Sequence, residues 1–373
     1  MAKKTLILHI GCPKTGSTSI QSFLDGNQAK LVRDGVVALR SFCLGSLVGL
    51  NSNALSFLLH GLDDYDETPR VRAQLRGFGI PDRDSLIAFQ ESMAEKLAEE
   101  VGAYDESCHT FIISGETLSS LRPKEIRRLK RLCGDLFDEI KVVCYLRRQD
   151  LYVISKYTTD LRNGASLTFA KHLDNHRDWG RAKYQVMLDR WADVFGKEAI
   201  SARVFERERL LGKDSVTDFC QACAIDYPKD YESGAPRNES LSALEQLILR
   251  ECNALAEDSA GKLAKSELRR VFVQCIVGRQ PGRPQRPTPE EAQALRADFE
   301  ESNELLRQGW FPDLEKVFSD KSSASSERSD EEPPLTPADL EPLYPSIHAY
   351  KGRNHELVPQ LLTAVERVKQ ALA

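Results

Sequence analysis

Lysine, hydroxyl and glycine residues lie close together between residues 11 and 19, in the segment Gly-Cys-Pro-Lys-Thr-Gly-Ser-Thr-Ser. An apolar run over residues 5–10 precedes the segment, and a helical pattern of apolar residues follows it. A strand, a short loop and a helix N-terminus expose backbone N–H groups to an anion, and the helix dipole favours negative charge there. The segment therefore predicts a phosphate or sulfate site built from Lys14, Thr15, Gly16, Ser17, Thr18 and Ser19.

This segment differs from the loop that binds nucleoside triphosphates. That loop places a lysine and then a serine or threonine directly after its second glycine. Here Gly11 and Gly16 have the required separation, but Lys14 lies between them and Ser17 follows. The hydroxyl that would bind magnesium is out of register, so we expect no metal in the site. A glycine- and serine-rich turn that precedes a helix and binds nothing is the alternative.

A second candidate anion site follows the apolar run over residues 140–146. Arg147 stands at the carboxyl end of this predicted strand, where α/β sheets place their ligands. Ser155 comes eight residues later, on the helix expected to follow. An arginine fork and a hydroxyl can hold one phosphate from two sides. Arg148 is a rival for this role, and an arginine paired with a nearby carboxylate is the alternative without a ligand.

An acidic residue follows a third apolar run, residues 110–114. Glu116 should emerge at the same sheet edge as the first loop and Arg147. Apolar neighbours such as Ile112 and Leu118 would raise the pKa of its carboxyl group, which suits a general base. The alternative is an acid that stabilises the first turn of a helix.

The Pro-Lys-Thr-Gly-Ser-Thr order resembles the 5′-phosphosulfate loop of sulfotransferases that use 3′-phosphoadenosine 5′-phosphosulfate (PAPS). The spacing of Arg147 and Ser155 is similar to the 3′-phosphate motif of that family, although Arg148-Gln149 replaces the usual Asp-Pro. The resemblance covers about residues 5–318 and implies PAPS as co-substrate. Because glycan-modifying relatives use a glutamate as base, it also implies a catalytic role for Glu116 and favours a carbohydrate acceptor.

Together the motifs predict a sulfotransferase of the P-loop nucleotide-binding superfamily. It would transfer the sulfuryl group of PAPS to a hydroxyl acceptor by in-line displacement, with Glu116 taking the proton and Lys14 neutralising the leaving oxygen. One alternative is a P-loop nucleotide kinase or hydrolase, which predicts Mg²⁺-dependent ATP binding. The other is a non-catalytic sulfonucleotide-binding protein, which predicts that Glu116→Gln leaves function intact.

Strand and helix patterns alternate along the first part of the chain, which predicts an α/β fold with a central parallel sheet flanked by helices on both faces. From about residue 240 the pattern is mostly helical. We expect one sulfotransferase-like domain over 1–318, in which residues 40–105 are a candidate acceptor-binding insertion. A Ser- and Glu-rich stretch predicts a disordered linker over 319–345, before a C-terminal helix within 346–373.

The composition of the chain limits the classes of partner and the cell compartment that we expect for it. The 373 residues carry a net charge of −5, which does not suit nucleic acid, and no apolar run is long enough for a membrane span. Nine cysteines in no disulfide framework, with the pair Cys220 and Cys223 expected in the core, favour a cytoplasmic protein. His172 and His176 share a helical face and could ligate zinc, but with no evident third ligand we expect a solvated face.

Overall fold

The chain forms two compact units. The computed structural model describes residues 3–43, 50–53, 55–77, 79–226, 241–258, 262–279, 282–319 and 334–373. The first unit contains residues 1–148, 180–237 and 301–318, and the second contains 149–179, 238–300 and 319–373. This division differs from the single domain expected over 1–318, because two internal segments cluster with the C-terminal part of the chain.

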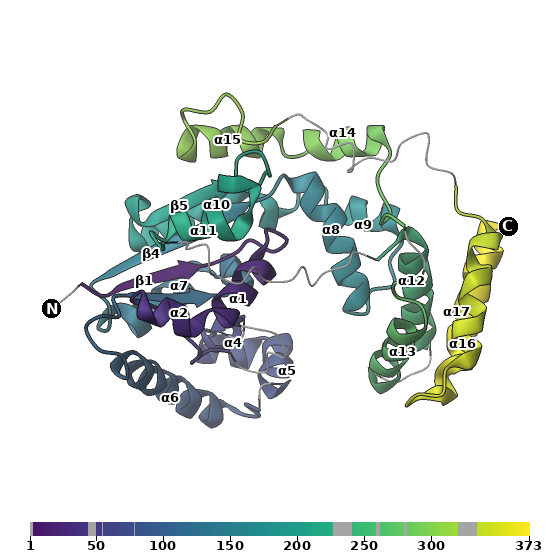
Figure 1. Cartoon of the computed structure of the whole chain (residues 1–373), viewed down its shortest axis with the longest axis horizontal. Helices are drawn as coiled ribbons and strands as arrows, with labels where there is room; N and C mark the ends of the chain where they lie inside the picture. The colour runs from purple at the N-terminus through teal and green to yellow at the C-terminus, as the bar shows by residue number, and fades with distance from the viewer. Residues whose placement is uncertain are drawn as a thin grey trace. The chain divides into compact units, whose positions relative to one another are not determined.

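A five-stranded sheet forms the centre of the first unit, and every strand pairs in parallel with its neighbours (Figure 1). The order is β2-β3-β1-β4-β5, which confirms the predicted α/β class. The strands are β1 (Thr5–His9), β2 (Val36–Ala38), β3 (Thr110–Ser114), β4 (Glu139–Leu146) and β5 (Ile200–Val204). Only β2 was not expected, because three residues are too few to give a pattern.

Alternate residues of a strand point to opposite faces of the sheet. Both faces therefore carry apolar side chains, and helices cover both. Leu6 and Leu8 of β1 pack in the larger apolar core, and Ile7 packs in the smaller one. The larger core receives apolar residues from α3 (Leu55–Leu58), α5 (Pro69–Gly77), α6 (Arg83–Gly102), α7 (Pro123–Gly134), α10 (Tyr184–Phe195) and α15 (Glu300–Trp310). The smaller core receives them from α1 (Ser17–Gly26), α2 (Gln28–Arg33) and α11 (Ser215–Ala222).

The strand order creates a switch point at the centre of the sheet. The chain leaves β1 toward β2 and β3 on one side, and it leaves β4 toward β5 on the other. Ligands of open α/β sheets bind at the carboxyl ends of such neighbouring strands. The loop after β1 and the residues after β4 stand at this position, so the topology brings the first candidate loop and Arg147 together.

The proposed acceptor insertion over 40–105 is helical in the described residues. It contains α3, α4 (Leu62–Glu67), α5 and α6. Leu86, Met93 and Leu97 of α6 are buried in the larger core, so this helix is part of the first unit's hydrophobic core. A role in acceptor binding stays a prediction.

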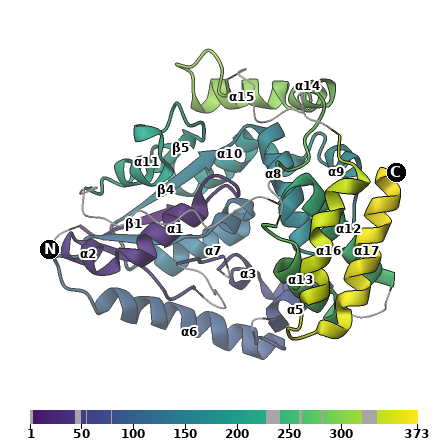
Figure 2. The same ribbon diagram turned by 45° about the vertical axis from the view of Figure 1, so that its right-hand side comes forward.

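In its described residues, the second unit contains helices and no strand (Figure 2). Its α-helices are α8 (Gln149–Arg162), α9 (Phe169–Asn175), α12 (Ala243–Asp258), α13 (Lys262–Cys275), α14 (Pro289–Ala297), α16 (Tyr344–Ala349) and α17 (Val358–Leu372). Helix α17 packs along α12 through buried apolar residues that include Leu361 and Val365.

The disordered linker expected over 319–345 lies partly outside the described residues, which resume at 334. At its C-terminal end the expectation is wrong: Pro337–Leu343 form a 3₁₀ helix that buries Leu340 and Leu343. Two buried leucines within four residues stabilise this short element. Because it directly follows a Ser- and Glu-rich stretch, the sequence composition alone did not indicate a helix there.

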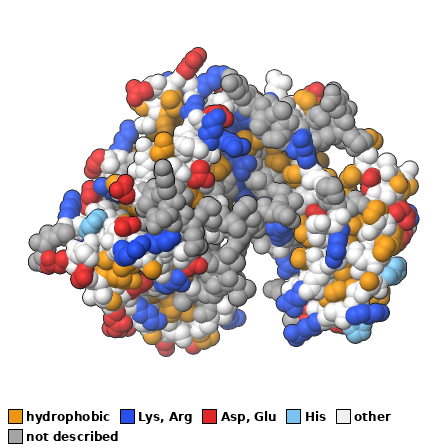
Figure 3. Space-filling view, viewed as in Figure 1, with side chains coloured by type: hydrophobic (Ala, Val, Ile, Leu, Met, Phe, Trp, Pro, Cys, Tyr) orange, Lys and Arg blue, Asp and Glu red, His pale blue; other side chains and the backbone are white. Residues whose placement is uncertain are grey.

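Charges of both signs are distributed over the face drawn in Figure 3, where Lys and Arg lie among Asp and Glu. Within the described part of the chain, no helix combines the length and apolarity needed to cross a bilayer. The expectation for Cys220 and Cys223 is confirmed: both are buried with free thiols, and burial raises their pKa values.

Candidate functional site

The loop after β1 folds around one of its own carbonyl groups. The hydroxyl groups of Thr15 and Ser17 donate to the C=O of Cys12 at 2.5 and 3.3 Å. Thr15 is fully buried, so its side chain stabilises the loop from inside. Gly16 caps α1 with φ 79°, a left-handed conformation that glycine adopts without strain. These contacts fix the turn that presents the first N–H groups of α1.

The start of α1 has the features of an anion site. Within α1, the N–H of Ser19 donates to the carbonyl of Gly16 at 2.9 Å, which closes the first turn. The preceding N–H groups of Ser17 and Thr18 lie in the first turn, which has no intrahelical acceptor. No acidic residue stands in this turn to compete with a bound anion.

Lys14 and Arg147 are joined through the loop backbone. Lys14 has φ 67°, which is uncommon for a residue with a side chain and recurs at functional sites. Its carbonyl accepts a hydrogen bond of 2.8 Å from Nη1 of Arg147. The carbonyl of Arg147 in turn accepts one of 2.7 Å from the hydroxyl of Tyr184. Arg147 therefore supports the loop directly, a contact that the sequence did not predict. Its rival Arg148 is buried.

Glu116 lies against the same loop, as expected from its place after β3. It begins a 3₁₀ helix, Glu116–Ser120. A methyl group added at Gly11 would lie 2.9 Å from Cα and from the carbonyl oxygen of Glu116, so the two backbones are in close contact. The charge of Lys14 and the side chain of Ser17 both act to lower the pKa of the Glu116 carboxyl group.

Two opposing effects act on the pKa of the Glu116 carboxyl group. Burial raises the pKa of the carboxyl group, and the Lys14 charge and the Ser17 hydrogen bond lower it by a smaller amount. The net direction is upward, as the sequence predicted. A partly desolvated carboxylate next to an ammonium group can accept a proton from a hydroxyl group and release it afterwards.

Asn53 fixes the turn that carries Glu116. Its side-chain oxygen accepts hydrogen bonds from the N–H and the hydroxyl of Thr117, at 3.0 and 3.1 Å. The N–H of Ser52 donates to the carbonyl of Ser114 at 2.8 Å, which ties the same segment to the end of β3. Nothing in the sequence around Asn53 indicated this positioning role, because the contact joins residues that are 64 apart.

Ser155, the second half of the predicted 3′-phosphate motif, lies on α8 in the second unit. Its hydroxyl donates to the carbonyl of Tyr152 at 3.2 Å. Such an i−3 bond is a common local contact of a helical serine. Pairing of Ser155 with Arg147 on one phosphate stays a prediction.

Aromatic rings can stack on sugars, so the positions of Trp179, Tyr184 and Trp191 bear on the carbohydrate prediction. Trp191 and Tyr184 are buried in the larger core. Trp179 stacks on Tyr152 with ring centroids 5.5 Å apart. Trp191 and Tyr184 are therefore core residues, and the ring of Trp179 already stacks on a ring of the protein.

A separate cavity of about 420 Å³ lies in the second unit. Leu241, Leu249, Phe272 and Val273 form most of its wall, and the arginines in its lining are Arg162, Arg269 and Arg270. Its described lining contains no acid or histidine, so it has no group suited to proton transfer near neutral pH. The site at the loop after β1 is therefore the stronger catalytic candidate.

Comparison with known proteins gives limited likenesses. No family model matches the chain. An uncharacterized protein of Archaeoglobus fulgidus is 30% identical over 143 residues, which are 38% of this chain and 38% of that protein's length. A sulfotransferase from Alicyclobacillus acidocaldarius is structurally similar over 71% of this chain and 100% of its own, with 15% identity and a TM-score of 0.39. The sulfotransferase domain from the curacin biosynthetic pathway matches 80% of this chain and 98% of its own, with 10% identity and a TM-score of 0.34. Likenesses at this level assign no activity to the chain.

Proposed function

We propose that this protein is a sulfotransferase that moves the sulfuryl group of PAPS to a hydroxyl acceptor. The observation that supports the proposal is the close contact of the Glu116 backbone with Gly11, in the loop that leads to the first turn of α1. A base, a cation and a set of helix N-terminal N–H groups at one sheet edge are the parts that such a transfer requires. The resemblance of the loop sequence to the 5′-phosphosulfate loop supports the choice of donor.

In the proposed reaction, the acceptor oxygen forms a bond to sulfur as the bond between sulfur and the bridging phosphate oxygen breaks. The leaving oxygen keeps the electron pair, and Lys14 neutralises the charge that develops there. Glu116 takes the acceptor proton, a contribution typically worth about 10²–10⁴-fold in rate. The products are a sulfate ester, 3′-phosphoadenosine 5′-phosphate and the proton held by Glu116.

The proposal assigns the nucleotide to two groups of residues. The N–H groups of Ser17 and Thr18 hold the 5′-phosphosulfate, with Thr15, Gly16 and Ser19 completing the turn. Arg147 and Ser155 hold the 3′-phosphate. By the resemblance, the acceptor is a carbohydrate hydroxyl group, and the reaction needs no metal.

Calorimetry tests the donor site. Titrate 3′-phosphoadenosine 5′-phosphate, ADP and ATP into the full-length protein, with and without Mg²⁺. We expect the 3′-phosphorylated nucleotide to bind most tightly, without a metal requirement, and Ser155→Ala to weaken it while leaving ADP binding unchanged. Preference for ATP with Mg²⁺ would favour a kinase or hydrolase, and equal binding of all three nucleotides would contradict the 3′-phosphate assignment.

Turnover tests the catalytic role. With labelled PAPS and a panel of sugars and phenols, Glu116→Gln should lose about 10²-fold or more in kcat and retain nucleotide affinity. Ser120→Ala, at the exposed end of the same 3₁₀ helix, is the matched control. If Glu116→Gln transfers sulfate at the wild-type rate, Glu116 is not the base.

A further inference from the structure

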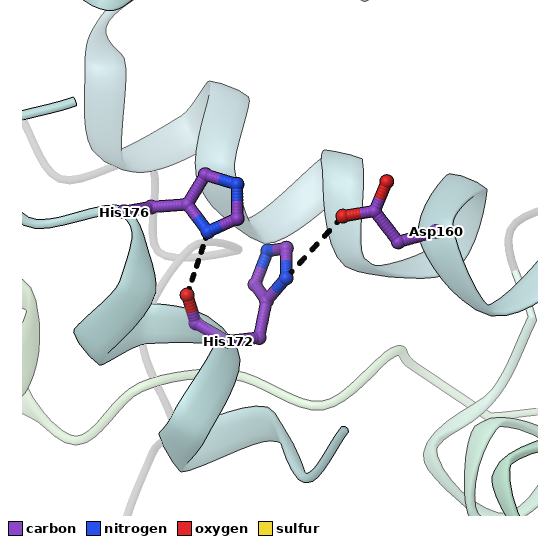
Figure 4. Close-up of side chains that lie close together, drawn as sticks. All are labelled: Asp160, His172 and His176. Carbon is purple, nitrogen blue, oxygen red and sulfur yellow. Dashed lines mark hydrogen bonds and ion pairs between the residues drawn. The ribbon is translucent and has the colours of Figure 1, made fainter. Parts of the chain in front are cut away.

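Two histidines and an aspartate of the second unit converge on one point (Figure 4). Asp160 lies near the end of α8, His172 lies on α9, and His176 caps the end of α9. Nδ1 of His172 is 3.5 Å from Oδ2 of Asp160, and the two imidazole centroids are 4.2 Å apart. The three side chains each place one ligand atom within 4.8 Å of the others.

The hydrogen bonds of both rings indicate which nitrogens carry lone pairs. Nε2 of His172 is 3.0 Å from the carbonyl oxygen of Val153, and Nδ1 of His176 is 2.7 Å from the carbonyl oxygen of His172. A carbonyl accepts only, so each of these nitrogens must be the protonated one. Nδ1 of His172 and Nε2 of His176 are then left with lone pairs. Metal-binding histidines are commonly fixed in this way, by donating their other N–H to a carbonyl.

This arrangement leaves an electrostatic conflict at His172. A neutral ring that donates to Val153 turns a lone pair toward a carboxylate oxygen of Asp160, and two electron-rich atoms 3.5 Å apart repel. The opposite tautomer only moves the repulsion to the carbonyl of Val153. A cation between the atoms removes the conflict.

Asp160 has one oxygen available for such a cation. Its Oδ1 pairs with the ammonium group of Lys156, while Oδ2 faces His172. Lys156 also lies over the ring of Trp179, 5.6 Å from its centroid. Lys156 is therefore held on the far side of the carboxylate, where it competes electrostatically with a second cation but does not block Oδ2.

A second cluster, His60, Asp64 and Glu125 in the first unit, provides a contrast. There Arg122 and Lys124 each pair with Asp64 at 2.9 Å, and Arg122 also pairs with Glu125. The two carboxylates are already neutralised by fixed cations, so this cluster has no charge deficit for a metal to fill.

We propose that Asp160, His172 and His176 bind a zinc ion that joins α8 to α9. Two imidazole nitrogens and one carboxylate oxygen are a common protein ligand set for zinc, with the fourth position left to water. Tetrahedral zinc separates its ligand atoms by about 3.4 Å, given bonds of about 2.0–2.2 Å. The distance of 3.5 Å between Nδ1 of His172 and Oδ2 of Asp160 already matches this value. The His176 ring must move closer to bind the same ion. The solvated face expected for His172 and His176 is wrong, because His172 is buried.

Metal titration of the full chain tests the proposal independently of sulfuryl transfer. After treatment with a chelator, the protein is titrated with Zn²⁺ by calorimetry and with Co²⁺ by visible absorption. We expect one ion per chain and a Co²⁺ spectrum of low coordination number without a thiolate charge-transfer band. Asp160→Asn and His176→Gln should each weaken binding by about tenfold or more. His355→Gln is the matched control, since His355 is an exposed histidine of the same unit.

The Lys156→Met variant distinguishes the loss of a zinc ligand from misfolding of the ligand variants. Removing the competing positive charge should tighten zinc binding, which a misfolded protein would not do. Three results would overturn the proposal: no binding of Zn²⁺ to the wild-type protein, equal binding by Asp160→Asn and His176→Gln, or a thiolate band that assigns the ion to cysteines.

Discussion

Replacement of Gly11 by alanine should damage the site more than the size of a methyl group suggests. Gly11 has φ +98°, which costs a residue with a side chain about 1–3 kcal/mol. The added Cβ would lie 2.9 Å from Cα and from the carbonyl oxygen of Glu116, where ordinary contacts begin at 3.4 Å. The backbone of Glu116 must therefore move by about 0.5 Å, and such overpacking costs about 1–3 kcal/mol more.

Together these terms predict a loss of about 2–6 kcal/mol in the free energy of unfolding of the first unit. Activity should fall as well, by at least about tenfold in kcat, since a displacement of 1 Å can cost about 10²-fold. The affinity for nucleotide should fall less than kcat, because Glu116 contacts the acceptor in the proposed reaction.

Tryptophan fluorescence during urea unfolding measures the stability loss. Trp191 and Trp310 belong to the first unit and Trp179 to the second, so a Trp179→Phe background reports the first unit alone. Gly26→Ala is the control, because Gly26 ends α1 and its Cβ would meet nothing within 4 Å. If Gly11→Ala is as stable and as active as Gly26→Ala, the close packing of Gly11 on Glu116 is wrong.

Four further predictions concern charge. The pH profile of kcat/KM should fall on the acid side at a higher pH than an ordinary carboxylate gives, because burial raises the pKa of Glu116 and the base must be deprotonated. Lys14→Met removes a charge that lowers this pKa, so the acid limb of its residual activity should move to higher pH; a move to lower pH would contradict the assignment. Asp218 is buried and accepts hydrogen bonds from Tyr145 at 2.7 Å and from Arg203 at 2.5 and 2.9 Å. Asp218→Ala should therefore cost about 3–5 kcal/mol in urea unfolding, against about 1 kcal/mol for Tyr145→Phe, and equal losses would refute this. Burial lowers the pKa of His9 to about 4. As the pH falls from 6.5 toward 4, the unfolded chain binds a proton that the folded ring does not, so the free energy of unfolding decreases by about 3 kcal/mol. His9→Gln should accordingly lose less stability than wild type between pH 7 and pH 4.5, and a parallel loss would count against a buried neutral ring.

Local sequence patterns predicted the framework of the first unit well. The strands β3 and β4 and the loop before α1 lie where the apolar runs placed them. The helical pattern that follows this loop is divided at Asn27 into α1 and α2, and the side chain and main-chain N–H of Asn27 both donate to the carbonyl of Phe23. Such a termination depends on one local contact, so a hydrophobic pattern does not reveal it.

The candidate site was predictable where chain order alone decides proximity. Parallel strands bring their carboxyl ends to one edge, which is why Glu116 and the loop could be placed together from the sequence. The contact of Arg147 with the carbonyl of Lys14 depends on a left-handed residue, and the approach of Asp160 to His172 depends on the turn between α8 and α9. Neither geometry corresponds to a pattern of residue types that can be recognised in the sequence.

The discontinuous first unit has a consequence for synthesis of the protein. Its last segment, 301–318, contributes Leu306, Val317 and Phe318 to the core that covers one face of the sheet. A ribosome adds about 5–20 residues per second, so these side chains are made roughly 16–64 s after the first residue. Until then the nascent chain lacks these three side chains, so part of the apolar surface of that core stays exposed to water. A truncated chain that stops before residue 301 should therefore accumulate as aggregate.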